Sequence, residues 1–318
     1  MNFPAITHIA AIGAGTMGHA TALEFAVHGY DVNLIDLSDQ ALAKGMDLIR
    51  RDLDELYQHG LLMKEETRDD VLERFSLFTD LAAGVKDADY ITESVAENLE
   101  VKKDLWKAVE EAAAADAIFT TNTSGLSPTA IADVLEKPDR FVVAHYWNPA
   151  HLMPLVEVVP GRYTSEQTVN TTVDLLTAIG KKPARLHRES PGFVGNRIQM
   201  AVIREALHIV EEGIASVEDV DTIVTYSLGR RWNILGPIIS ADLGGLDIFY
   251  KISTYLPQDL DNSTEPNKLL ADKVAEGDLG SKSGQGFYRW TGQKGAETIA
   301  RRDEELMKAL VSDRQEEE

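Results

Sequence analysis

A glycine-rich turn near the N-terminus constrains the fold more than any other feature of the sequence. It follows an apolar run that begins at Ile6, and a helical pattern starts at Thr16. In such a turn the first glycine permits a tight bend, the second lets an anion approach the backbone, and the third lets helix and strand pack closely. Amide groups at the helix start then attract phosphate. The turn that predicts this dinucleotide site is Gly13-Ala14-Gly15-Thr16-Met17-Gly18.

The first half of the chain alternates short apolar runs with helical patterns. This alternation predicts buried parallel strands joined by helices, and hence a Rossmann-type, doubly wound α/β sheet. We expect strands at Ile6–Ile12, Asp31–Ile35, Ser76–Phe78, Tyr90–Ser94, Ile118–Thr121, Phe141–Ala144 and Leu155–Val159. We expect helices at Thr16–His28, Gln40–His59, Glu65–Glu73, Glu97–Ala115, Pro128–Leu135 and Ser165–Ile179.

The pattern changes near residue 188, after which the chain reads as helices alone. A chain of 318 residues is longer than one hydrophobic core usually supports. We therefore predict a dinucleotide-binding domain over residues 1–188 and an all-α domain over residues 189–318. The expected helices of the second domain are Pro191–Glu212, Val217–Ser227, Gly236–Tyr255 and Glu265–Glu276.

Asp36 identifies the dinucleotide as NAD. It ends the second expected strand, 18 residues after Gly18, close to the spacing of about 20 at which an acid binds the adenosine ribose. Its carboxylate would accept hydrogen bonds from the ribose hydroxyls and repel a 2′-phosphate. No arginine follows within Leu37-Ser38-Asp39. The alternative is that Asp36 caps the next helix.

His145 and Glu157 form the most informative pair of polar residues. His145 lies at the end of one expected strand, and Glu157 lies inside the next apolar run. A carboxylate in an apolar strand is costly unless it has a partner, and a histidine is a suitable one. The carboxylate would orient the ring and stabilise the imidazolium, so that the other ring nitrogen can move a proton.

The chain resembles the L-3-hydroxyacyl-CoA dehydrogenase family over most of its length. The segments that carry the resemblance are IGAGTMGHA, ESVAENLEVK, TTNTSGLS, HYWNPAHLMPLVEVV, PGFVGNRI and LGSKSGQGFYRW. The resemblance implies that His145 is the general base, with Glu157 as its partner, and that Ser124 hydrogen-bonds the reacting oxygen. It also implies that Asn196 reaches the substrate. The residues that it implies near the nicotinamide end are Glu97, Lys102, Asn122 and Asn148.

Composition excludes several other classes of function. The net charge of −21 disfavours nucleic acid and anionic membranes as partners. The absence of cysteine excludes disulfides, thiolate metal sites and thiol nucleophiles, and it fits a cytoplasmic location. No spacing of histidines and acids predicts a metal site. No apolar run reaches the ~18 residues of a membrane helix.

The substrate class stays open between two alternatives. The first is a small acyl substrate carried as a CoA thioester, as in fatty acid metabolism. The second is a free 3-hydroxy acid, as in the gulonate and carnitine dehydrogenases, which the acidic surroundings of Arg50 and Arg51 favour. Arg230 and Arg231 would be available to bind a carboxylate, and His151 is a further candidate pocket residue.

Two further expectations concern the protein as a whole. A crystallin-like protein that binds NAD without catalysis is an alternative of another class, because fold alone does not decide activity. The helices after Pro191 carry more apolar residues than a small domain needs, which predicts a homodimer.

Overall fold

The computed structural model describes residues 6–63 and 65–317. The chain divides into two compact units, Met1–Val194 with Arg302–Glu318, and Gly195–Arg301. The sequence-based division put every residue after 188 into the second domain. In the structure, the chain end returns to the first unit instead. Within the described residues, no helix is both long enough and apolar enough to cross a membrane.

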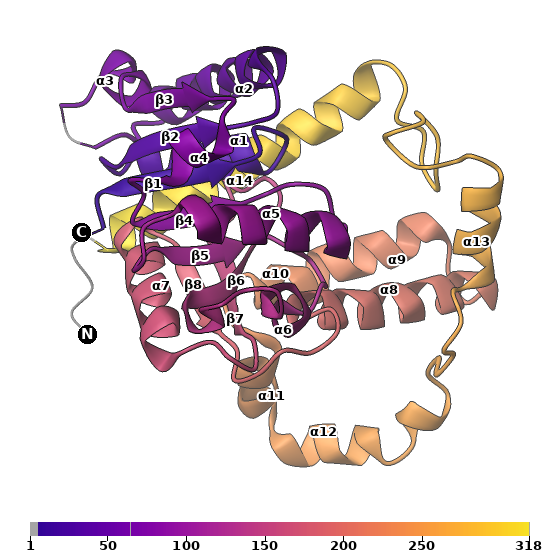
Figure 1. The fold of residues 1–318 in the computed structure, drawn as a ribbon. Helices are drawn as coiled ribbons and strands as arrows, with labels where there is room; N and C mark the ends of the chain where they lie inside the picture. The colour runs from indigo at the N-terminus through magenta and orange to yellow at the C-terminus, as the bar shows by residue number, and fades with distance from the viewer. Residues whose placement is uncertain (1–5, 64, 318) are drawn as a thin grey trace. The chain divides into compact units, whose positions relative to one another are not determined.

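An eight-stranded sheet forms the centre of the first unit, in the order β3-β2-β1-β4-β5-β6-β7-β8. The strands, drawn as arrows in Figure 1, are β1 (His8–Ile12), β2 (Asp31–Ile35), β3 (Phe75–Phe78), β4 (Tyr90–Glu93), β5 (Ile118–Thr121), β6 (Phe141–Tyr146), β7 (Leu155–Pro160) and β8 (Lys182–Arg185). All neighbours pair in parallel except β6 and β7. The predicted Rossmann-type fold is confirmed.

The prediction that β7 lies parallel to its neighbour was wrong. β7 pairs antiparallel with β6, because residues 147–154 connect the two strands, and a parallel crossover needs a dozen or more residues. β8 has no counterpart among the expected strands, since its sequence KPAR lacks an apolar run and its side chains are largely exposed.

Helices cover both faces of the sheet. Alternate residues of β1 point to opposite faces, so that Ile9 and Ala11 join one core and Ala10 and Ile12 join the other. Helices of the first core are α1 (Gly18–Ala26), α2 (Asp39–Gln58), α3 (Arg68–Leu72), α7 (Glu166–Ala178) and the end of α14 (Gln293–Glu317). Helices of the second core are α4 (Leu81–Val85), α5 (Leu99–Ala112) and α6 (Pro128–Ala132).

The end of α14 packs on the first core although the sequence analysis expected no helix there. Met307 is 2% exposed, and Leu306, Leu310 and Val311 pack against the same core. Arg314 donates from Nη1 to the carbonyl oxygen of Leu61 over 2.6 Å. This narrow apolar stripe lies in an otherwise charged segment, which explains why the pattern was missed.

The second unit is helical, as expected. Its α-helices are α8 (Gly195–Glu211), α9 (Val217–Ile223), α10 (Gly229–Trp232), α11 (Pro237–Gly244), α12 (Leu246–Ser253) and α13 (Lys268–Ala275). A π-helical segment, Val224–Leu228, joins α9 to α10, so the helix predicted over Val217–Ser227 continues to Trp232. A single helix was predicted over Gly236–Tyr255, but Gly245 takes a φ of +91° and separates α11 from α12. Only a glycine adopts this backbone conformation without strain.

Candidate active site

The glycine turn between β1 and α1 is shaped by close backbone contacts. Gly13 has a φ of +95°, and a Cβ there would lie 2.7 Å from the Ser94 carbonyl oxygen. A Cβ on Gly18 would lie 1.7 Å from the Gly13 carbonyl oxygen. Around Gly15, in contrast, a Cβ would meet nothing within 4 Å. The outer glycines are therefore needed for packing, while the middle one borders open space at the start of α1.

Asp36 lies beside this turn. Its Oδ2 accepts a hydrogen bond of 2.7 Å from the Ala14 amide, and its Oδ1 accepts one of 2.7 Å from the Leu37 amide. It does not cap α2, because Ser38 does so by accepting from the Ala41 amide over 3.2 Å. The half-buried carboxylate thus lies at the carboxyl end of β2, where a doubly wound fold binds ligands.

His145 and Glu157 face each other across the β6–β7 pairing. They occupy directly opposed positions in the register, and His145 Nδ1 lies 2.8 Å from Glu157 Oε2. Both side chains are buried, with 5% and 2% exposed. The Val194 amide donates to the second carboxylate oxygen, Oε1, over 3.0 Å. Because a carboxylate only accepts, Nδ1 carries a proton, and Nε2 is the nitrogen that can exchange one.

Two aromatic rings flank the histidine. The ring centroids of Trp147 and Phe193 lie 5.7 Å and 5.6 Å from that of His145. Phe193 belongs to a buried apolar cluster with Val143, Val159 and Leu186. The imidazole is therefore held by packing as well as by its hydrogen bond, which keeps its orientation fixed.

Asn122 ties together the ends of three neighbouring strands. Its backbone amide donates to the Glu93 carbonyl oxygen over 2.7 Å. Its Nδ2 donates to Ser94 Oγ over 3.3 Å, and its Oδ1 accepts from the Tyr146 amide over 3.2 Å. Asn122 thus joins the segment after β4 to the last residue of β6, one position beyond His145.

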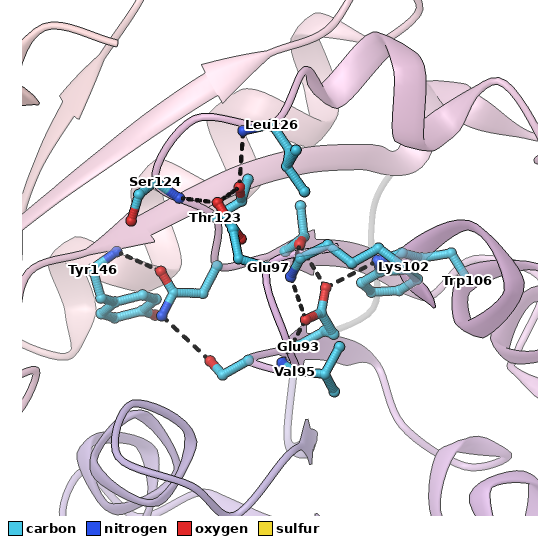
Figure 2. A network of polar contacts seen from close by, with 12 residues as sticks. Glu93, Val95, Glu97, Lys102, Trp106, Thr123, Ser124, Leu126 and Tyr146 are labelled. Atoms are coloured by element: carbon cyan, nitrogen blue, oxygen red, sulfur yellow. Dashed lines mark hydrogen bonds and ion pairs between the residues drawn. The ribbon is translucent and has the colours of Figure 1, made fainter. Parts of the chain in front are cut away.

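Glu97 binds the loop that carries Ser124 (Figure 2). Its Oε1 accepts from Thr123 Oγ1 over 2.5 Å and from the Ser124 amide over 3.0 Å. The Thr123 hydroxyl also accepts from the Leu126 amide over 3.0 Å. Ser124 itself is exposed. Glu97 therefore orders the loop, on which Ser124 is exposed.

Lys102 is fully buried, contrary to the expectation that it lines the nicotinamide end. Its Nζ donates to Glu93 Oε1 over 2.6 Å and to Thr121 Oγ1 over 3.2 Å. Both members of the ion pair are 0% exposed. A side chain enclosed in this way cannot contact a ligand without rearrangement. Its position is that of a support beneath the loop after β4.

Glu93 is a site residue that the sequence analysis missed. Its Oε1 accepts from the Val95 amide over 2.6 Å, and its Oε2 accepts from Thr121 Oγ1 over 2.5 Å and from Trp106 Nε1 over 3.3 Å. Figure 2 shows Val95, Lys102 and Trp106 around the Glu93 carboxylate. The sequence did contain a signal for Glu93, because it is an acidic residue in a buried strand, as Glu157 is.

The remaining expected residues lie at separate places in the chain. Asn148 is exposed in the connection after β6, three positions beyond His145. Asn196 lies in the first turn of α8, in the second unit. His151 is 6% exposed, and its Nδ1 lies 3.3 Å from Asp52 Oδ2. The structure therefore brings together the turn, Asp36, Asn122 and the His145–Glu157 pair along one edge of the sheet.

Two family models match the chain over nearly its whole length. The model described as "3-hydroxyacyl-CoA dehydrogenase, NAD binding domain" matches residues 8–190. The model described as "3-hydroxyacyl-CoA dehydrogenase, C-terminal domain" matches residues 192–290. The change from one model to the other falls within a few residues of the boundary between the two units at Val194.

The individual proteins that are similar to this chain are named for two different dehydrogenase activities. The 3-hydroxybutyryl-CoA dehydrogenase of Clostridioides difficile is 38% identical over 281 residues, covering 88% of this chain and 98% of that protein. The 5-formyl-3-hydroxy-2-methylpyridine 4-carboxylate 5-dehydrogenase of Mesorhizobium japonicum is 32% identical over 302 residues, covering 95% and 96%.

A solved structure is similar over the same extent. It is a 5-formyl-3-hydroxy-2-methylpyridine 4-carboxylic acid 5-dehydrogenase, described as an NAD+-dependent dismutase. It matches with a TM-score of 0.91 and 31% identity, covering 97% of this chain and 99% of that chain.

The buried Glu93–Lys102 pair gives a prediction for stability. We expect Lys102→Met to lower the free energy of unfolding by about 3–5 kcal/mol, because it leaves a buried carboxylate without its counter-charge. Adding Glu93→Gln should restore a large part of that loss. Urea unfolding of the two single variants and the double variant measures this. A double variant as unstable as the sum of the single ones would contradict the coupling.

Proposed function

Because the chain belongs to the 3-hydroxyacyl-CoA dehydrogenase family, and is thus an NAD-dependent oxidoreductase acting on a CH–OH group, we propose that His145 and Glu157 carry its proton transfer. The family and the cofactor that the sequence predicted are confirmed by these matches. The observation that carries the proposal is the bond between His145 Nδ1 and Glu157 Oε2, at 2.8 Å. It leaves Nε2 to act on the substrate.

The residues of the first unit fit NAD. The pyrophosphate would lie at the start of α1, where the surroundings of Gly15 are open. The Asp36 carboxylate would hold the adenosine ribose, next to the Ala14 amide that it already binds. Bound NAD supplies the acceptor for the hydride that leaves the hydroxyl carbon.

In the proposed mechanism, His145 Nε2 takes the proton of the substrate hydroxyl as the alcohol is oxidised. Glu157 stabilises the resulting imidazolium across the strand pairing, and in reduction the same nitrogen returns the proton to the oxygen. Ser124 would donate a hydrogen bond to the reacting oxygen. Asn122 and Asn148 would position the nicotinamide end, and Asn196 would contact the substrate.

The substrate we propose is a 3-hydroxyacyl thioester of coenzyme A, as the relative's name 3-hydroxybutyryl-CoA dehydrogenase suggests. A free hydroxy acid is the second candidate. It is favoured by the pairing of arginines in and after α2 with aspartates: Arg50 with Asp47 at 3.1 Å, Arg51 with Asp52 at 2.7 Å, and Arg68 with Asp54. Cations neutralised in this way are less available for the phosphates of coenzyme A.

Paired turnover assays test the proposal. NADH oxidation is followed with acetoacetyl-CoA and, separately, with acetoacetate. We expect the thioester to be reduced with the higher kcat/KM. A higher kcat/KM for acetoacetate would show that the substrate is a free hydroxy acid and not a CoA thioester. No turnover of either compound, in a protein that binds NADH, would contradict the proposed 3-oxo substrate.

Replacing Glu157 tests the proton-transfer pair. In Glu157→Gln, the amide oxygen is needed by the Val194 amide, so the amide NH₂ group faces His145 Nδ1. The ring proton then moves to Nε2, which can no longer accept one. We expect kcat to fall by about 10²- to 10⁴-fold. Steady-state kinetics and an NADH fluorescence titration measure the two effects.

NADH affinity should change little in Glu157→Gln, because the turn and Asp36 hold the other end of the cofactor. Glu166→Gln, at an exposed position paired with Arg185, serves as the control and should leave kcat unchanged. A Glu157→Gln protein that keeps its kcat would contradict the assigned role.

Asp36 should set the preference for NAD over NADP. A 2′-phosphate beside its carboxylate would bring like charges together, which costs several kcal/mol, so we expect kcat/KM with NADH to exceed that with NADPH by roughly a hundredfold or more. Asp36→Ser should narrow the gap by raising kcat/KM with NADPH. Equal or better use of NADPH by the unaltered protein would contradict this role.

We propose that the protein is a homodimer formed through the second unit. Several large apolar side chains of α11 and α12 are strongly exposed within a single chain, among them Ile238 at 78%, Leu243 at 74% and Leu246 at 62%. Monomers rarely leave an apolar surface of this extent in water. The same unit contains a cavity of about 560 Å³ lined largely by apolar side chains, such as Phe287 and Trp290.

Light scattering tests the dimer. We expect a mass of about twice the 35.0 kDa of one chain at micromolar concentration. The double variant Ile238→Glu/Leu243→Glu should be monomeric, because two buried charges would oppose the interface. The control Leu77→Glu, on strand β3, should stay dimeric. An unaltered protein that is monomeric would contradict the proposal.

The cytoplasmic location and the role in fatty acid metabolism stay predictions.

A further inference from the structure

A buried histidine lies directly behind the glycine turn. His19 is the second residue of α1 and is 4% exposed. Its Nδ1 lies 2.7 Å from the Gly15 carbonyl oxygen, and its Nε2 lies 2.9 Å from Asp52 Oδ2. The ring therefore connects the backbone of the turn to a carboxylate on α2 that is itself 1% exposed.

The hydrogen bonds of His19 determine its charge. A backbone carbonyl oxygen can only accept, so Nδ1 must carry a proton. An ionised carboxylate can also only accept, so Nε2 must carry one as well. Burial alone would raise the pKa of Asp52, but the hydrogen bonds from His19 and Arg51 hold it below its usual value. Asp52, which also pairs with Arg51, is thus ionised, and each ring nitrogen of His19 faces a group that can only accept.

The other neighbours of Asp52 do not replace His19 as the partner of Oδ2. Burial lowers the pKa of His151, against the opposing influence of Asp52 and Glu24, so His151 is neutral near neutral pH. Arg51 binds the other carboxylate oxygen, Oδ1, at 2.7 Å from Nη2. Asp52, Glu55 and His151 lie close enough to bind a metal ion, with their ligand atoms within 4.8 Å of one another. However, His19 and Arg51 already supply positive charge to Asp52.

We propose that His19, kept protonated by Asp52, strengthens the binding of the cofactor's pyrophosphate. The Gly15 carbonyl that accepts from the imidazolium belongs to the same peptide unit as the Thr16 amide. A cationic donor on the carbonyl polarises that unit, and hydrogen bonds in series reinforce one another. The amide becomes a stronger donor to an anion. The buried charge also adds to the positive end of the α1 dipole. The inference depends on the proposed binding of the pyrophosphate at the turn.

A matched pair of histidine variants tests the effect. His28, just after the end of α1, makes the same kind of contact, with its Nδ1 2.7 Å from the Glu24 carbonyl oxygen four positions earlier. We expect His19→Gln to raise the Kd for NADH by about 3- to 30-fold, the range for a charge at a helix end. His28→Gln should leave the Kd within about twofold, because His28 lies beyond the far end of α1 and burial lowers its pKa. Fluorescence titration measures both constants.

A second variant separates charge from structure. In Asp52→Asn, the amide can still donate to His19 Nε2, so both contacts of the ring persist while its second proton is lost. We expect Asp52→Asn to weaken NADH binding about as much as His19→Gln, and the double variant to bind no more weakly than either. This variant also keeps the test decisive if His19→Gln fails to fold.

NMR of the ring nitrogens reads the protonation directly. In the unaltered protein near neutral pH, both nitrogens of ¹⁵N-labelled His19 should be protonated, and in Asp52→Asn only Nδ1 should be. A neutral His19 in the unaltered protein would overturn the inference, as would an unchanged Kd in Asp52→Asn. Gly15→Val checks the premise separately, because it fills the open space at the turn. If it leaves NADH binding intact, the proposed pyrophosphate position is wrong, whatever the state of His19.

Discussion

The antiparallel pairing of β6 with β7 is the contact on which the candidate site depends. It places Glu157 directly opposite His145, and the chain beyond β8 brings the Val194 amide to the second carboxylate oxygen. Together these contacts decide which ring nitrogen carries the fixed proton. A parallel β7 would need a long crossover and would remove this register. The exception to the parallel order of the sheet is therefore what brings together the proposed proton-transfer pair.

Buried carboxylates recur beneath the edge of the sheet where ligands are expected. Glu93 receives Lys102 and orders the loop after β4, Glu157 receives His145, and Asp52 receives His19. An unpaired buried carboxylate would be costly, so each one requires a donor in a fixed place. These contacts in turn fix the position of a backbone segment or the orientation of a ring. The need of a buried carboxylate for a donor thus supports the glycine turn near His19, the loop after β4 and the orientation of His145.

Much of the first unit could be predicted because its signals are local. The strands Asp31–Ile35 and Ile118–Thr121 were predicted with the bounds that the structure has. The pairing of His145 with Glu157 followed from the rule that a buried charge needs a partner. The burial of Lys102 could not be predicted in this way, since its environment is made by residues distant in sequence. The packing of Met307 in the first core is likewise a tertiary contact that no local sequence pattern predicts.

The claim that His145 exchanges the substrate proton is tested most directly in a single turnover. Enzyme saturated with NADH is mixed with acetoacetyl-CoA in a stopped-flow instrument, with a pH indicator present. We expect NADH oxidation to be accompanied by the uptake of one proton, and His145→Gln to slow both signals by about 10²- to 10⁴-fold while NADH binds as before. If His145→Gln oxidises bound NADH at the rate of the unaltered protein, His145 is not the proton donor.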